Sequence, residues 1–143
     1  DIGKVALDSV YPDNFQEAVK LAVERAKPLW EAEPEVFGLD HAEIGGVLAE
    51  HWNLPPVLAE ALRKHHQPDT ALLAPELTHV TALANHLTYE AGLGEASNPG
   101  THAFPVSSAN HINATVEVCR YIVTELQGAS DRIDAMLGAV AEP

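Results

Sequence analysis

The stretch Gly38–His66, GLDHAEIGGVLAEHWNLPPVLAEALRKHH, predicts the centre of the fold, two short helices joined by a tight turn. Asp40 and Glu43 have the spacing of a capping box, which starts a helix at His41. Proline disfavours helix in the residue before it, so the Asn-Leu-Pro-Pro sequence at 53–56 ends this helix. The two prolines of this sequence are tolerated in the first turn of a helix, so the second helix is predicted to start there.

Histidines are expected to gather at one end of this helix pair. A short connection normally makes two helices antiparallel neighbours, so the start of the first lies beside the end of the second. His41 is then placed next to His65 and His66, and His65 falls on the apolar stripe that faces the core. Three converging imidazoles suit a transition metal. The alternative is a set of hydrogen-bonded histidines that cap helix C-termini.

Charge and composition limit the possible partners. The chain has 143 residues, enough for one domain with a single core, and a net charge of -13. Beyond Lys64 its only basic residues are Arg120 and Arg132, so nucleic acid and anionic membrane surfaces are not expected as partners. No signal peptide is expected, and no apolar run in this sequence is long enough to span a bilayer. The single cysteine, Cys119, is expected in the core and fits a cytoplasmic location.

Helical periodicity continues on both sides of the hairpin, and no segment has the pattern of a strand. Helices are predicted at residues 1–7, 12–27 and 29–37, and Glu31, Glu33 and Glu35 in the last of these are interpreted as a solvated face. A further helix is expected from Pro75 to about Ala91. Its predicted buried side consists of Leu77, Val80, Ala84, Leu87 and Ala91, which leaves His79 and His86 on the surface.

The C-terminal part divides into a loop and two helices. Residues 95–110 are rich in Gly, Pro, Ser and Asn and have no periodic pattern, which predicts either a functional loop or a connector. In the first case, His102 and Phe104 would cover a pocket. Helices are expected over about residues 111–140, with a break at Gly128.

Several of these segments together carry a family resemblance. They are Asp1-Ile-Gly-Lys4, Phe37-Gly-Leu-Asp-His-Ala-Glu-Ile-Gly45, His51-Trp-Asn-Leu-Pro55, His65-His66-Gln67-Pro68 and the run from Val80 to Leu87. The chain resembles the HDOD branch of the HD superfamily, the output domains of bacterial signalling proteins. The resemblance implies a single compact all-α domain over residues 1–143, with an HD-like core at about 1–94. Because the chain begins at Asp1 rather than at methionine, we expect a fragment whose N-terminal helices are missing.

The resemblance also implies a metal site. Catalytic HD phosphohydrolases hold metals that activate water for attack on a phosphate ester. Asn85 stands where the family has its final aspartate, and an amide lacks the anionic oxygen that a carboxylate offers. We therefore expect either no cofactor or a weakly bound divalent transition metal (Fe, Mn or Zn). In an enzyme, Lys4 would contact the phosphate. The matching ligands are Asp1, His41, His65 and His66.

Two main functions follow from the resemblance. The leading hypothesis is a regulatory or output module that acts without turnover, through contacts with signalling proteins or with other domains of the full-length chain. The alternative is a metal-dependent phosphohydrolase acting on nucleotides or cyclic dinucleotides. A third possibility is a helical interaction domain with no ligand site.

Overall fold

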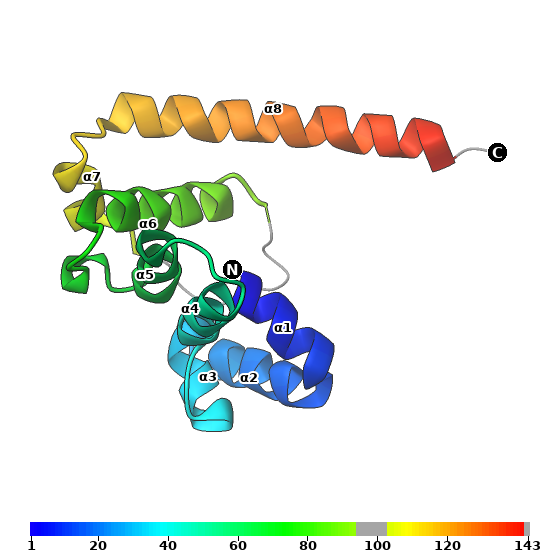
Figure 1. The fold of residues 1–143 in the computed structure, drawn as a ribbon. Helices are drawn as coiled ribbons and strands as arrows, with labels where there is room; N and C mark the ends of the chain where they lie inside the picture. The colour runs from blue at the N-terminus through cyan, green and yellow to red at the C-terminus, as the bar shows by residue number, and fades with distance from the viewer. Residues whose placement is uncertain (94–102, 142–143) are drawn as a thin grey trace.

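The computed structural model describes the backbone of residues 1–93 and 103–141, and the side chains of residues 1–93, 103–130 and 132. Its described part is all-α, as predicted, and contains eight α-helices, one 3-10 helix and no strand (Figure 1). The elements are α1 (Ile2–Val10), α2 (Pro12–Glu24), α3 (Leu29–Phe37), α4 (His41–His51), α5 (Pro56–Lys64), η1 (Pro68–Thr70), α6 (Pro75–Glu90), α7 (Val106–His111) and α8 (Val116–Ala141).

The predicted hairpin is formed by α4 and α5 and lies at the centre of the molecule (Figure 1). Its capping box is complete: the Glu43 backbone N–H donates to Asp40 Oδ1 over 2.8 Å, and the Asp40 backbone N–H donates to Glu43 Oε2 over 3.3 Å. The turn contains Asn53 with φ 56°, a left-handed conformation that asparagine tolerates. Pro56 then occupies the first turn of α5, as expected.

Helices α1, α2 and α3 form an apolar layer that packs against α4. Gly3 makes the approach of α1 to α4 possible, because a Cβ atom at this position would lie 2.0 Å from the backbone oxygen of His41. Gly45 of α4 faces α1, and Gly46 faces the side chain of Arg63 on α5. The buried residues of this layer are Leu7, Phe15, Ala18, Ala22, Leu29 and Ala32.

Helix α6 is rotated relative to the predicted face. Val80 and Ala84 are exposed, whereas His79 and His86 are buried, so the prediction for these four residues was wrong. The histidines are accommodated because each has a polar neighbour: His79 Nδ1 lies 3.1 Å from Ser108 Oγ, and His86 Nε2 lies 3.4 Å from a carboxylate oxygen of Glu90. The buried positions of α6 are Thr78, His79, Ala82, Leu83, His86 and Leu87.

The C-terminal region differs from its prediction in two places. Residues 106–110, expected in a loop, belong to α7, while His102 and the first half of the predicted loop (95–102) lie outside the described residues. The chain then continues in α8 through Gly128 without a break, because glycine inside a helix costs only about 1 kcal/mol relative to alanine. Cys119 is buried against α6 and α7, as expected.

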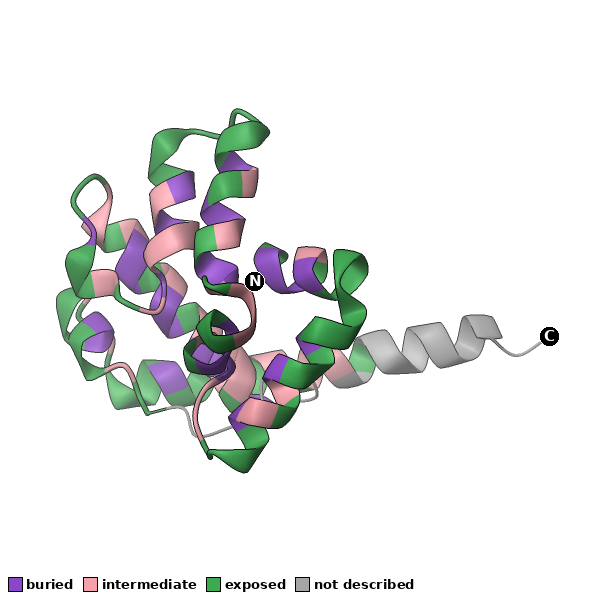
Figure 2. Ribbon diagram, turned by 90° about the horizontal axis from the view of Figure 1, so that it is seen from below, coloured by how far each residue is buried: buried purple, intermediate pink, exposed green. Residues whose placement is uncertain are grey.

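Burial is concentrated where the helices face one another (Figure 2). Helix α8 packs along α6 and extends past it (Figure 1). In the part of the chain that the structure describes, we find no helix with the length and apolarity needed to cross a membrane.

Candidate metal site

Four predicted ligands meet at the end of the α4–α5 hairpin. One ligand atom from each of Asp1, His41, His65 and His66 lies within 4.8 Å of the other three, and we call these residues the His/Asp cluster. His41 is the first residue of α4, and His65 and His66 directly follow α5. Asp1 reaches them because α1 packs closely on α4. The antiparallel geometry inferred from the sequence therefore accounts for the three histidines, and α1 adds the carboxylate.

Short distances join the donor atoms of the cluster. Asp1 Oδ1 lies 3.2 Å from His41 Nε2 and 3.6 Å from His65 Nε2. The Nε2 atoms of His41 and His66 face each other across 2.9 Å. Trp30 covers His66 on the other side, with ring centroids 5.2 Å apart and planes inclined by 12°. The three Nε2 atoms and one carboxylate oxygen thus point at a common region.

Glu33, on α3, fixes the orientation of His41. Its fully buried carboxylate accepts a hydrogen bond from His41 Nδ1–H over 2.6 Å and another from the His41 backbone N–H over 2.8 Å. A proton on Nδ1 leaves Nε2 of the neutral ring with a lone pair toward the cluster. A carboxylate behind a histidine is the usual outer partner of a metal-bound imidazole, because it sets the tautomer and raises the basicity of the ligand.

The sequence prediction for Glu33 was wrong, since it assigned this residue to a solvated face. The signal was present in the spacing: Glu33 lies one residue after Ala32 and four after Leu29, both fully buried. The three therefore share the inward side of α3. The regular alternation of Glu31, Glu33 and Glu35 concealed this helical pattern.

His65 presents its Nε2 to the cluster for a similar reason. Its Nδ1 lies 2.7 Å from the carbonyl oxygen of Leu62, which can only accept, so Nδ1 carries the proton. Nε2 is buried and has no hydrogen-bond partner. Burial lowers the pKa of His65 to about 4 and also lowers the pKa of His41, against the opposing effect of Glu33. Both rings are therefore neutral at pH 7, the state that binds metals.

Lys4 holds the carboxylate of Asp1. Its buried ammonium lies 3.2 Å from Asp1 Oδ2, which leaves Oδ1 for the histidines. Burial lowers the pKa of Lys4 to about 8, while the charge of Glu33 opposes this shift. Lys4 thus has a structural partner inside the protein, and its contact with a phosphate stays a prediction.

The donor set fits a divalent transition metal. Three imidazole nitrogens and one carboxylate oxygen are ligands that zinc and iron accept. His41 and His65 already have their second nitrogens engaged, as in metal-bound histidines. The orphaned Nε2 of His65, buried beside Asp1 Oδ1, is a polar atom for which a cation would provide the missing partner.

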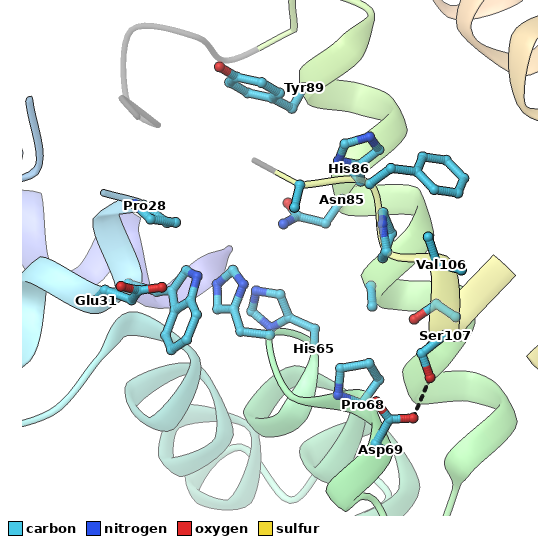
Figure 3. Close-up of a pocket in the computed structure, with 17 residues that line it drawn as sticks. Pro28, Glu31, His65, Pro68, Asp69, Asn85, His86, Tyr89, Val106 and Ser107 are labelled. Atoms are coloured by element: carbon cyan, nitrogen blue, oxygen red, sulfur yellow. Dashed lines mark hydrogen bonds between the residues drawn. The ribbon is translucent and has the colours of Figure 1, made fainter. Parts of the chain in front are cut away.

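A half-open cavity of about 480 Å³ adjoins the cluster and is shown in Figure 3. His65 and His66 form part of its lining, together with Asn85 and His86 from α6. Asn85 therefore lies beside the cluster, although it contributes no atom to the four-ligand group. Phe104 also lines the cavity, which is consistent with the functional-loop alternative for this residue.

Comparison with known proteins identifies the N-terminal half of the chain. Residues 1–68 match the model of the HDOD domain family. This segment is similar to HDOD domains. It contains the whole His/Asp cluster together with Lys4 and Glu33, whereas Asn85 lies beyond the matched residues. The HDOD domain is a signalling module related to the HD superfamily.

A bacterial relative shares the same region. The chain is 33% identical over 66 residues to an uncharacterized protein of Treponema pallidum (strain Nichols). The alignment covers 46% of this chain and 13% of that protein, so the chain corresponds to a small part of its relative. No solved structure matches the chain.

Proposed function

We propose that this HDOD-containing chain is a regulatory module of bacterial signal transduction that binds one divalent transition metal without turning over a substrate. The observation that carries the proposal is the composition of the His/Asp cluster. Four protein side chains converge on one position. Structural zinc sites have four protein ligands, whereas catalytic sites have three and keep one position open for water or substrate. The cluster has the number of ligands typical of a structural site.

Asn85 supports the same conclusion. A carboxylate at position 85 would offer an anionic oxygen ligand beside the cluster, and the amide of Asn85 does not supply one. A cation bound to the cluster would supply positive charge that joins Asp1 to the histidines at the ends of α4 and α5. Within the protein, Glu33 and the Leu62 carbonyl orient two of those histidines, and Lys4 orients the aspartate.

The output is proposed to pass through contacts with signalling proteins or with other domains of the full-length protein, in the cytoplasm. The net charge of -13 makes nucleic acid and anionic membranes poor partners. A metal-dependent phosphohydrolase is the second candidate. It is favoured by the cavity of about 480 Å³ that opens directly beside His65 and His66.

Metal content and hydrolysis distinguish these two functions. The full-length protein, purified without chelator, is expected to contain about one equivalent of iron, manganese or zinc, measured by elemental analysis. His41→Ala is expected to lose it. Neither protein is expected to hydrolyse nucleotides or cyclic dinucleotides when supplied with these metals. Hydrolysis that requires metal and disappears in His41→Ala would establish the enzyme, and a wild-type protein without metal affinity would refute the metal site.

A further inference from the structure

The cavity beside the cluster carries negative charge at its rim. Glu31 and Asp69 contribute carboxylates to the lining, and both residues are exposed to solvent. No lysine or arginine is among the described residues that line the cavity. Lys27, one turn before Glu31, is held by the carboxylate of Glu35 at 2.5 Å. A phosphorylated ligand would therefore meet like charge, whereas a cation would be attracted.

The two carboxylates lie on different sides of the cavity. Figure 3 shows Glu31 beside Pro28 on the α3 side and Asp69 beside Ser107 on the opposite wall. Asp69 is held in place, because its Oδ1 accepts a hydrogen bond from the Ser107 hydroxyl. The two carboxylates therefore offer separate contacts to a ligand that carries two positive charges.

Between the charges, the cavity offers aromatic and neutral polar groups. Trp30 and Phe104 are part of its lining, and aromatic faces attract alkyl chains and ammonium groups. Phe104 is held edge-on against His86, with ring centroids 5.3 Å apart. Asn85 adds an amide oxygen to the lining, whereas the buried Nε2 of His86 already lies 3.4 Å from a carboxylate oxygen of Glu90. The Asn85 oxygen is able to accept a hydrogen bond from an N–H donor.

We propose that this cavity binds an aliphatic diamine or polyamine. The terminal ammonium groups pair with Glu31 and Asp69, and the alkyl chain packs against Trp30 and Phe104. Asn85 accepts a hydrogen bond from an N–H group of the ligand. The volume of about 480 Å³ lies in the range of small-molecule sites. The inference supplies a ligand for the regulatory module proposed above, but the binding contacts themselves require no metal.

The experiment uses spermidine and 1,4-diaminobutane as probes at 150 mM salt. Trp52 is exposed and does not line the cavity, so the variant Trp52→Phe leaves Trp30 as the only tryptophan reporter. Saturable quenching or a spectral shift of Trp30 is expected on addition of either amine, and calorimetry on the wild-type chain provides the affinity. The titration is repeated after chelation, which separates failure of this site from failure of the metal site.

Matched variants test the charge pairs. Glu31→Gln and Asp69→Asn are each expected to weaken spermidine binding about tenfold, the effect of losing one favourable charge contact of about 1.4 kcal/mol. Glu125→Gln removes the same charge from an exposed position on α8 and is expected to change the affinity less than twofold. Circular dichroism confirms that each variant is folded.

Three results would overturn the proposal. The first is no spermidine binding at millimolar concentration, either with metal or after chelation. The second is an equal loss of affinity in Glu125→Gln, which would show that the acidic surface attracts amines without a defined site. The third is tighter binding of a nucleotide or cyclic dinucleotide than of spermidine, which would assign the cavity to phosphorylated ligands.

Discussion

Replacement of Glu33 by glutamine tests whether a buried charge controls the His/Asp cluster. The carbonyl oxygen of glutamine can occupy the position of Oε2 and accept both hydrogen bonds from His41. Its amide group then replaces Oε1, which is buried without a hydrogen-bond partner. The variant therefore keeps the shape and both hydrogen bonds but removes the negative charge behind the imidazole. Its expected effect is on metal affinity rather than on folding.

The magnitude follows from the role of such outer partners. Mutation of a carboxylate behind a metal-bound histidine typically weakens metal binding 10- to 100-fold, which corresponds to about 1.4–2.7 kcal/mol. We expect Glu33→Gln to fall within this range in a competition titration with a chromogenic zinc chelator. Glu33→Ala removes the oxygen that accepts both hydrogen bonds and leaves two buried donors of His41 unpaired. At about 1–3 kcal/mol for each donor, the free energy of unfolding of the metal-free protein should fall by about 2–6 kcal/mol.

Glu35→Gln is the matched control, since it removes the same charge from the same helix. Glu35 is exposed and pairs with Arg25 at 2.7 Å, so we expect no measurable change in metal affinity and little change in stability. If Glu33→Gln binds zinc as tightly as wild type, or loses no more affinity than Glu35→Gln, the charge of Glu33 does not act on His41. The assignment of Glu33 as a positioning residue would then be refuted.

Two further predictions concern stability. Gly3→Ala should lower the free energy of unfolding by about 3 kcal/mol in a urea titration, because its Cβ would lie 2.0 Å from the rigid backbone oxygen of His41. Gly46→Ala would meet side-chain atoms of Arg63 at 2.7–2.9 Å, which can move more easily than backbone, and should cost clearly less. Equal costs would refute the close approach of α1. Glu60 accepts backbone N–H bonds from residues 72–74, first of all from Leu72, and these lower its pKa from 4.5. The contribution of Glu60 to stability is therefore complete above pH 4.5 and is lost as the pH falls through the lower folded pKa. Glu60→Gln should destabilise the protein at pH 7 and have a smaller effect at pH 3. An equal effect at both pH values would contradict this.

The sequence predicted the hairpin and its histidines because both depend on local rules. A capping box, a proline turn and a short connection specify where α4 begins, where it ends and that α5 returns beside it. These three features place His41 beside His65 and His66 with no knowledge of tertiary packing. The position of Asp1 came from the family resemblance, and its physical basis, the absence of a side chain at Gly3, is visible only in the packed structure.

The errors arose where tertiary contacts decide which face is buried. Helix α6 packs on α5 as well as on α7 and α8, so polar residues that find partners are buried in preference to some apolar ones. His79 lies inside because Ser108 of α7 contacts its ring, and α7 itself has no periodic signal over its six residues. Glu33 lies inside because its acceptor meets two donors of His41. Pairing of this kind depends on residues distant in sequence or on neighbouring helices.

The arrangement of the cluster explains how metal binding without turnover could serve regulation. Asp1 belongs to the start of α1, His41 to the start of α4, and the other two histidines to the end of α5. Glu33 links α3 to the same point through His41. A cation bound there would link α1, α4 and the end of α5 directly, and α3 through Glu33. Gain or loss of the cation would therefore change the stability of residues 1–68. Such a change can shift the conformations available to a binding partner without any chemical reaction.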